Sequence, residues 1–295
     1  MLSTGKLSHC GVMVNYRCNA ACRHCLYSCS PTRTPGYVNE DSMEEICRLL
    51  RKGGCRSVHI GGGEPFLDFE GLLMVVRKLR QAGIKLEYTE TNAFWAANTQ
   101  DQSGAIEKLG CLLAEGANCL CISIDPFHAE YVPNAAPLAL AKLCEKIGMD
   151  YFLYNASKYP LHYSGRAINI EREFGTLYPA ENFASDNSPC RNLLSTGHFH
   201  VDLHCYFIPP LCTGIILPMP EVMDGIPPGK YRAFEALYSG GVSALLQLAE
   251  EYGFTSDKSG YTSGCNLCIN LRHFLSEKDF PELDKNHYEE ALKYY

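Results

Sequence analysis

The sequence predicts an α/β protein built on a parallel sheet or barrel. Up to about residue 156, short apolar runs alternate with segments of helical periodicity, and such alternation requires right-handed crossovers between parallel strands. The chain has 295 residues, of which 46% are hydrophobic and 20% charged. That is long enough for one large α/β domain with a small appendage.

Five strands and four helices are predicted in this first part, in alternating order. In the first helix, Met43, Ile46 and Leu49 recur at helical spacing, behind a cap at Asn39 or Asp41. Glycines end the second and third helices. The strands are expected at residues 12–14, 57–60, 84–89, 119–124 and 150–154, and the helices at residues 41–52, 69–81, 105–114 and 137–147.

The pattern changes in the second half of the chain. Residues 159–190 are rich in Pro, Gly, Asn and Ser and show no long helical pattern, which is typical of a boundary. A hairpin-like stretch follows at residues 198–208, and residues 231–252 are helical apart from an interruption at Gly240 and Gly241. We therefore expect a main domain at residues 1–185 and a small α+β module, a β-hairpin plus a helix, at residues 186–295.

Composition excludes several classes of protein. Lys and Arg number 26 against 33 Asp and Glu, and the net charge of −7 argues against a nucleic-acid partner. No apolar run is long enough to span a membrane, and the N-terminus leads into no signal peptide. We expect a cytoplasmic protein, in which the 16 cysteines are metal ligands, catalytic groups or buried apolar residues rather than disulfides.

Three cysteines lie close together directly after the first predicted strand. Cys18, Cys22 and Cys25 have the spacing C-x3-C-x2-C, which suits three ligands of a [4Fe–4S] cluster. The fourth iron then has no protein ligand and is open to substrate or cofactor. Structural zinc is one alternative, although zinc usually takes four ligands. Cys29 leaves another alternative, a ferredoxin-like cluster with four cysteine ligands and no open iron.

This motif resembles the signature of the radical S-adenosylmethionine (radical SAM) superfamily. The resemblance implies a partial (β/α)6 barrel, similar to a TIM barrel, in which Cys18, Cys22 and Cys25 hold the cluster. It also implies that S-adenosylmethionine (SAM) binds the open iron and is cleaved reductively to a 5′-deoxyadenosyl radical under anaerobic conditions. A flavodoxin or a ferredoxin-type protein is then the implied electron donor.

Further motifs resemble those of this family at the ends of later strands. Residues 61–65 resemble the G-G-E-P motif that engages the SAM amino group, and residues 89–93 resemble a stretch that lines the SAM pocket, with Ala93 in place of a frequent Gly. Each motif also has a purely structural alternative. Residues 61–65 would be a tight strand-to-helix turn and residues 89–93 a solvated turn. Asp125 would be a helix or turn cap, and Arg166 an ordinary surface arginine. His128 is a candidate substrate contact or proton carrier, or a surface histidine. The residues that the resemblance implies for SAM binding are Gly62, Gly63, Glu64, Thr91, Asn92, Ser123, Asp125 and Arg166.

A second set of cysteines lies in the predicted C-terminal module. Cys190, Cys212, Cys265 and Cys268 are four cysteines from separate segments, which suits a closed [4Fe–4S] or zinc site. The pattern resembles the twitch domain, a shortened form of the auxiliary-cluster module called SPASM, and implies one auxiliary [4Fe–4S] cluster. Cys205 competes with Cys212 as a ligand from the hairpin. Buried thiols without a metal are the remaining alternative.

The leading functional hypothesis is a radical SAM oxidoreductase or maturase that oxidises a peptide or protein side chain, as relatives with such modules do. Oxidation of a small sugar-like metabolite is the alternative. A non-catalytic iron–sulfur or zinc protein is a remote third hypothesis. The sequence identifies no catalytic residue beyond those that bind the cofactors.

Overall fold

An eight-stranded sheet forms the framework of the molecule. The computed structural model describes residues 2, 5–98 and 100–293. The strand order is β5-β4-β3-β2-β1-β6-β7-β8; the strands from β5 to β6 are parallel, and β7 and β8 are added antiparallel. The strands are β1 (His9–Met13), β2 (Ser57–Gly61), β3 (Lys85–Thr91), β4 (Cys119–Ser123), β5 (Asp150–Tyr154), β6 (His198–Asp202), β7 (Tyr206–Ile208) and β8 (Leu217–Pro218).

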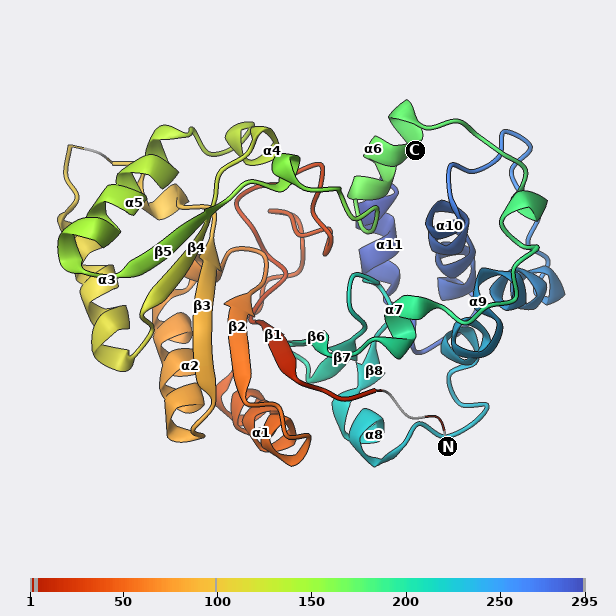
Figure 1. Cartoon of the computed structure of the whole chain (residues 1–295), viewed down its shortest axis with the longest axis horizontal. Coiled ribbons are helices and arrows are strands. Elements are labelled where there is room, and N and C mark those ends of the chain that lie inside the picture. The colour runs from red at the N-terminus through yellow and green to blue at the C-terminus, as the bar shows by residue number, and fades with distance from the viewer. Residues whose placement is uncertain (1, 3–4, 99, 294–295) are drawn as a thin grey trace.

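The helices form two groups, one on each side of the β6–β7 hairpin. Figure 1 shows α1, α2, α3 and α5 side by side on the outer face of the parallel strands, and α6, α9, α10 and α11 together at the other end of the molecule. The helices are α1 (Glu40–Lys52), α2 (Phe69–Gln81), α3 (Ser103–Glu115), α4 (Pro126–Ala129), α5 (Ala135–Ile147), α6 (Ala167–Phe174), α7 (Arg191–Leu194), α8 (Met219–Asp224), α9 (Arg232–Glu251), α10 (Gly264–Ser276) and α11 (Lys285–Ala291).

The structure confirms the predicted α/β class and the alternating elements of the first half. Helix α2 and strand β5 have the predicted bounds. Strand β1 begins earlier than predicted, at His9, because pairing with β2 on one side and β6 on the other extends it through polar and glycine positions. Helices α6 and α11 were not predicted; they are short, and each buries one face against the rest of the molecule. Tertiary packing rather than local sequence therefore stabilises them.

The two faces of the parallel strands have different environments. Along β1, Cys10 and Val12 are completely buried in the main hydrophobic core. Met13 instead belongs to a second small cluster together with Cys18 and Cys22. Because successive side chains of a strand point to opposite faces, His9 and Gly11 share the inner face with Met13. The inner face of the sheet is thus the one that the cysteine loop covers.

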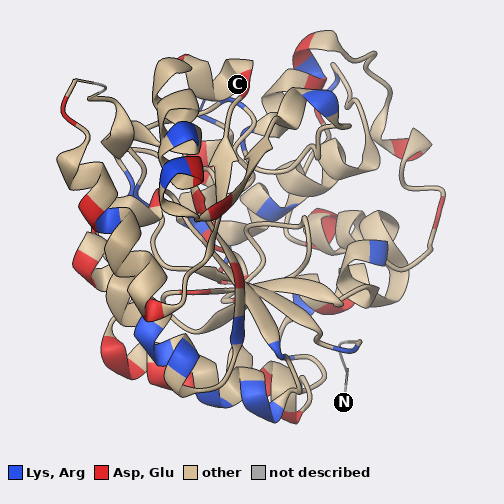
Figure 2. Cartoon of the chain, turned by 60° about the vertical axis from the view of Figure 1, so that its left-hand side comes forward, with Lys and Arg blue, Asp and Glu red and all other residues tan. Residues whose placement is uncertain are grey.

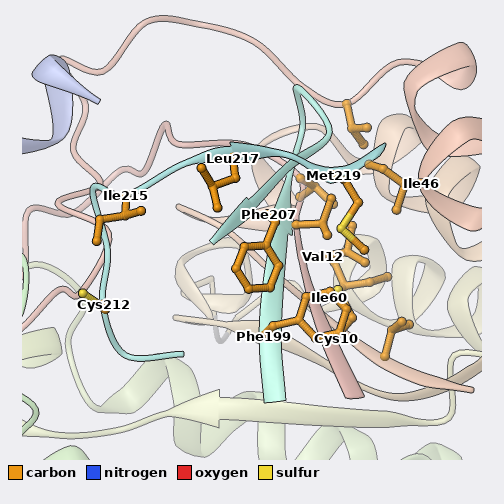
Figure 3. Close-up of a cluster of buried hydrophobic side chains, with 14 of the residues drawn as sticks. Cys10, Val12, Ile46, Ile60, Phe199, Phe207, Cys212, Ile215, Leu217 and Met219 are labelled. Carbon is orange, nitrogen blue, oxygen red and sulfur yellow. The ribbon is translucent and has the colours of Figure 1, made fainter. Parts of the chain in front are cut away.

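The sheet and the core continue across residue 185, where a domain boundary is predicted. The predicted hairpin at 198–208 is present as β6 and β7, but β6 also pairs in parallel with β1, from His9↔His198 to Met13↔Asp202. It is therefore the sixth parallel strand of the partial barrel. Figure 3 shows one cluster shared by both halves of the chain, with Cys10, Val12, Ile46 and Ile60 from the first half and Phe199, Phe207, Leu217 and Met219 from the second.

Charged residues lie mainly on the outer surface of the molecule. Figure 2 shows Lys and Arg interspersed with Asp and Glu along the outer helices, without a continuous stripe of one sign in that view. Several of them pair across neighbouring helices, as Lys78 of α2 does with Glu40 of α1. Among the described residues, no helix has the length and apolar character needed to cross a membrane.

Candidate functional site

A cavity of about 470 Å³ opens where the parallel strands end. The loop after β1 forms one wall with Cys18, Cys22 and Cys25, and the turn after β2 contributes Gly62, Gly63 and Glu64. In parallel α/β folds, ligands bind at the carboxyl ends of the strands, because the loops that vary there converge on one space. The cavity brings most of the predicted SAM-site residues together: Cys18, Cys22, Cys25, Gly62, Gly63, Glu64, Thr91, Asn92 and Ser123 line it.

Arg166 ties the cysteine loop to the body of the protein. Its Nε donates to the carbonyl oxygen of Cys22 at 3.1 Å, and Nη2 donates to that of Cys29 at 2.6 Å. The backbone N–H of Arg166 donates to the carbonyl of Cys25. Only 2% of the residue is exposed, and Nη1 is buried without a hydrogen-bond partner among the described residues. Arg166 is therefore not a surface arginine: it positions the loop and places a buried positive charge beside three thiols.

The three thiols of the loop are electrostatically unequal. Burial raises the pKa of the Cys18 thiol to about 12 and that of Cys22 higher still. A hydrogen bond from Cys29, with help from the charge of Arg166, instead holds the pKa of Cys25 well below its usual value. The backbone N–H of Cys29 also donates to the Cys25 sulfur at 3.4 Å. Cys29 is thus placed as a hydrogen-bond donor to a predicted ligand.

The glycines of residues 61–65 allow the turn after β2 to touch the cysteine loop. A Cβ on Gly63 would lie 2.0 Å from the carbonyl oxygen of Arg17 and 3.0 Å from the nitrogen of Cys18. Gly62 has φ of +154°, and a Cβ there would lie 2.6 Å from Asn15 Oδ1. Asn15, which is buried, accepts a hydrogen bond from Gly63 N–H and donates to the Glu64 carbonyl. Only residues without a side chain fit this contact.

Glu64 connects the turn after β2 to the turn after β3. Its carboxylate accepts hydrogen bonds from the Thr91 hydroxyl at 2.9 Å and from the Asn92 backbone N–H at 2.7 Å. Burial raises the pKa of Glu64 to about 7, although these hydrogen bonds oppose the rise. The Asn92 amide donates to Asn19 and to the Cys18 sulfur, at 2.9 and 3.7 Å. Glu64 therefore orders the residues around the first cysteine.

Ala93 stands where the resembling family often has glycine, and its backbone is left-handed with φ of +65°. Alanine takes up this conformation at a cost of about 1 kcal/mol. The Ala93 N–H donates to the Thr91 hydroxyl, which also accepts from Trp95. The replacement therefore keeps the tight turn.

Asp125 lies beside the cavity and caps the short helix α4. Its Oδ1 accepts from the backbone N–H groups of Phe127 and His128, and its Oδ2 lies 2.8 Å from His128 Nδ1. Burial opposes the charged form, but the hydrogen bond and charge of His128 hold the pKa of Asp125 at about 2. His24 of the cysteine loop lies 3.7 Å from the same oxygen and stacks on Phe127. The carboxylate thus links the β4 loop to the cysteine loop.

The donor set fits an iron–sulfur cluster with SAM. Three sulfurs on one loop line a single cavity, beside the buried cation of Arg166, which favours the thiolate forms of all three. Thiolate sulfur is the ligand that such clusters require. The unpartnered Nη1 of Arg166 is a donor available to an anionic group.

The second set of cysteines lies around α10 and the loop that follows β7. The thiols of Cys190, Cys212, Cys265 and Cys268 lie near enough for their charges to interact with one another. Cys205 instead lies near Cys10 and Glu45, away from this set. In Figure 3, Cys212 lies at the opposite end of the hydrophobic cluster from Cys10.

A buried arginine accompanies this second set. Arg272 of α10 is 3% exposed, and its Nη1 donates to the Thr213 carbonyl at 2.8 Å and to the Tyr288 hydroxyl at 3.0 Å. Burial raises the pKa of Cys212 to about 12 and that of Cys268 to about 11, and Arg272 opposes both shifts. No carboxylate of the described residues forms an ion pair with this guanidinium, so it suits an anionic group held by these cysteines.

The spread of the sulfurs bears on which metal they suit. In the part of the chain that the structure describes, no three cysteine sulfurs lie within 4.8 Å of one another. Zinc with bonds of about 2.3 Å to sulfur needs thiolates roughly 3.8 Å apart. A cubane cluster binds each thiolate through a different iron and accepts a wider spread.

Sequence reasoning missed the inner wall of the cavity. Strand residues at alternate positions line it, among them Tyr88 and Glu90 of β3 and Phe152 and Tyr154 of β5. Burial raises the pKa of Glu90 to about 7, and the neighbouring Glu64 adds to the rise. The signal that reveals such residues is polar or aromatic character at every second position of a strand in a parallel sheet.

Comparison with known proteins agrees with this site. Residues 12–133 match the sequence model of the Radical SAM superfamily. YydG of Bacillus subtilis (strain 168), whose name refers to peptide biosynthesis, is 29% identical over 127 residues, which are 42% of this chain and 38% of YydG. The chain thus matches well under half the length of this curated relative.

Solved structures of similar fold include BtrN in complex with AdoMet and 2-DOIA. That chain is 14% identical, with a TM-score of 0.51, and the likeness covers 81% of this chain and 90% of BtrN. Streptococcus suis SuiB bound to the precursor peptide SuiA is 12% identical with a TM-score of 0.43, over 88% of this chain and 76% of SuiB. Residues 12–133, which match the family model, contain the cysteine loop, the Glu64 turn and the ends of β1 to β4. This part of the chain therefore matches a domain of the Radical SAM superfamily, a family that uses SAM and a [4Fe–4S] cluster.

Proposed function

We propose that the chain is a radical SAM enzyme that oxidises a peptide or protein side chain. The observation that carries this proposal is the convergence of three cysteine sulfurs and the Glu64 turn on one cavity, with the buried Arg166 behind the cysteine loop. Cys18, Cys22 and Cys25 would hold the cluster, leaving one iron for SAM. The cavity-lining residues proposed to surround SAM are Gly62, Gly63, Glu64, Thr91, Asn92 and Ser123. Asp125 and Arg166 lie behind this lining, and the unpartnered Nη1 of Arg166 is the proposed donor to the SAM carboxylate.

With the cluster held by Cys18, Cys22 and Cys25, bound SAM would supply a 5′-deoxyadenosyl radical for removal of a hydrogen atom from the substrate. The chain itself orients and shields that reaction. Glu64 fixes the turns that would face SAM, while Tyr88, Phe152 and Tyr154 form an aromatic wall on one side of the cavity. Because a carbon radical reacts with whatever lies nearest, exclusion of water and rigid placement determine which substrate atom is attacked.

A peptide substrate is supported by the match to YydG and by the edge of the sheet next to the cavity. Strand β5 is the last strand of the sheet and carries exposed Phe152, Leu153 and Tyr154, with Tyr159 stacked on Tyr154. Extended peptides can add to such an edge through backbone hydrogen bonds, while aromatic side chains hold alternate residues. This edge would bring a peptide side chain to the mouth of the cavity.

An auxiliary cluster at the second cysteine set belongs to the same proposal. Cys190, Cys212, Cys265 and Cys268 would hold it, with Arg272 offsetting its negative charge. Such a cluster supplies an acceptor for the electron that a substrate radical loses. The proposal assigns this cluster to a twitch-like module at residues 186–295. It also includes an oxidoreductase or maturase activity, with a flavodoxin or a ferredoxin-type protein as the electron donor.

Oxidation of a small metabolite is the second candidate. It is favoured by the likeness to BtrN, whose solved structure holds 2-DOIA beside AdoMet, and which this chain covers over 90% of its length. The inner wall also carries Glu90 and His200, which can hydrogen-bond a small polar substrate.

Anaerobic reconstitution with iron, sulfide, SAM and dithionite tests the proposal. We expect 5′-deoxyadenosine, and with a cognate peptide a product that has lost two hydrogen atoms by mass spectrometry. A deuterium label on the reacting carbon should appear in 5′-deoxyadenosine. Label transfer from a polyol or aminosugar but from no peptide would favour the second candidate. Intact clusters without any 5′-deoxyadenosine would leave a non-catalytic iron–sulfur protein.

A further inference from the structure

Four histidines gather on the inner face of the sheet. Three of them, His59, His198 and His200, line the same cavity as the cysteine loop, and the His200 ring packs edge-to-face against Tyr27 of that loop. His9 and His198 are the first residues of β1 and β6 and are partners in register. His59 and His200 are both partners of Gly11, one from β2 and one from β6. Since His9 and Gly11 lie on the inner face of β1, their register partners lie on the same face.

Gly11 makes this arrangement possible. A Cβ at that position would lie 2.0 Å from His200 Cδ2 and 2.6 Å from His59 Nε2. Two imidazoles from the flanking strands therefore occupy the space over Gly11. The motif His198-Phe199-His200 contributes through its alternate residues, because Phe199 points into the hydrophobic core on the other face.

The ring nitrogens are close enough to share one ion. His9 Nε2 lies 3.0 Å from His59 Nδ1. One ring nitrogen from each of His9, His59 and His198 lies within 4.8 Å of the other two. Ligand nitrogens of a tetrahedral metal with bonds of about 2.0–2.1 Å are roughly 3.4 Å apart, so small ring movements would suffice.

The protonation state of the cluster suits a metal ion. Burial lowers the pKa of His9, His59 and His198, and neighbouring imidazoles add to the lowering for His59 and His198. The pKa of His200 falls to about 3 for the same reasons. All four rings are therefore neutral at pH 7, and neutral imidazole is the form that binds metals.

One hydrogen bond and one nearby carboxylate resemble the supports of metal-binding histidines. His9 Nδ1 lies 2.8 Å from the Ser57 hydroxyl, which fixes the ring and leaves Nε2 facing His59. Glu90 Oε1 lies 3.8 Å from His59 Nε2, the nitrogen opposite the one that faces His9. His200 Nδ1 is buried without a hydrogen-bond partner among the described residues. Carboxylates and hydroxyls that hold the second ring nitrogen orient such ligands.

We infer that His9, His59 and His198 bind one divalent first-row transition metal ion, with zinc as the simplest occupant and His200 adjacent. Three imidazoles leave a coordination position for water or a substrate oxygen. His198 is exposed and His9 partly exposed, so an ion can reach the site from solvent. His59, His198 and His200 line the cavity proposed for SAM, but none of the histidines belongs to the cysteine sets, so binding of the ion can be tested apart from the proposed function.

Zinc binding by the full chain with reconstituted clusters tests the site. After incubation with Zn²⁺ and gel filtration, we expect about one zinc per chain, and X-ray absorption at the zinc edge should show nitrogen rather than sulfur neighbours at about 2.0–2.1 Å. His198→Gln, at the exposed position, and His9→Gln should lose most of this zinc. His204→Gln is the matched control, because His204 lies in the β6–β7 turn outside the cluster.

Iron is counted in every sample, so that a loss of clusters is separated from a loss of zinc. Zinc that is absent from the unmodified chain, or that has sulfur neighbours, would overturn the inference. So would zinc content that is unchanged in both His198→Gln and His9→Gln while iron stays constant. Failure of SAM cleavage would not affect it, since the readout is zinc content.

Discussion

Replacing Gly63 by alanine should disrupt the cluster at Cys18, Cys22 and Cys25, although Gly63 has no side chain and cannot itself be a cluster ligand. The added Cβ would lie 2.0 Å from the carbonyl oxygen of Arg17 and 2.4 Å from its carbonyl carbon. Carbon and oxygen atoms do not approach much closer than about 3 Å without strain, so the backbone just before Cys18 must move by roughly 1 Å.

The surrounding hydrogen bonds determine the cost of that movement. Gly63 N–H donates to Asn15, and the Glu64 N–H donates to the Arg17 carbonyl at 3.1 Å. Breaking one buried hydrogen bond costs about 1–3 kcal/mol, and overpacking adds about 1–3 kcal/mol. We therefore expect a destabilisation of about 2–6 kcal/mol, with Cys18 displaced from its partners.

Iron content and urea unfolding measure this effect. Gly63→Ala should lose up to about four iron atoms per chain, one cubane cluster, and unfold at lower urea. Gly110→Ala is the matched control. Beyond its chain neighbours and the backbone of helix α3 itself, none of the described residues has an atom within 4 Å of its Cβ position, so this variant should keep its iron and gain about 0.5–1 kcal/mol. Full iron content and unchanged unfolding in Gly63→Ala would refute the argument.

Three further predictions concern other parts of the account. The double variant Cys265→Ala, Cys268→Ala should lose about half of the iron and Cys205→Ala none, by iron and sulfide analysis; equal losses would contradict the grouping. Arg166→Lys, which cannot span two carbonyls, should lose iron on gel filtration, whereas unchanged retention would show that the clamp is dispensable. Burial raises the pKa of Glu64 from 4.5 to about 7. The stability that protonated Glu64 contributes is therefore fully present below pH 4.5 and is lost as the pH rises to 7. Urea titrations should show the free energy of unfolding falling by up to about 3 kcal/mol over that range, and Glu64→Gln should flatten the fall.

The first half of the fold could be predicted because its signals are local. Helix α2 has apolar residues at helical spacing between Asp68, whose side chain caps it, and the glycine that follows its end. The cysteine loop and the Gly-Gly-Glu-Pro turn carry their chemistry in a few adjacent residues. Such patterns can be read without knowledge of the partner strands.

The second half of the fold could not be predicted in the same way, because it is formed by contacts between residues far apart in the sequence. The pairing of β6 with β1 joins residues almost 190 positions apart, and nothing in residues 198–202 specifies that partner. The histidine cluster arises only from this pairing. The grouping of Cys212 rather than Cys205 with the other cysteines follows from which side of the hairpin each thiol occupies, and spacing alone left both open.

The contacts of Arg166 and Asp125 also required the structure. Sequence could place both near the strand ends, but not show that Arg166 donates to carbonyls of the cysteine loop or that Asp125 caps α4 and contacts His128. Both residues hold neighbouring loops of the site together through these contacts. Polar groups buried beside a cofactor commonly have such positioning contacts.

The central claim is that Cys18, Cys22 and Cys25 hold a cluster that cleaves SAM while Cys29 only donates to Cys25. The most direct test is 5′-deoxyadenosine formation by the reconstituted chain, by the triple alanine variant of the three ligands, and by Cys29→Ser. The account predicts product from the unmodified chain and from Cys29→Ser, and none from the triple variant. Product formation by the triple variant, or a loss in Cys29→Ser equal to that in the triple variant, would contradict it.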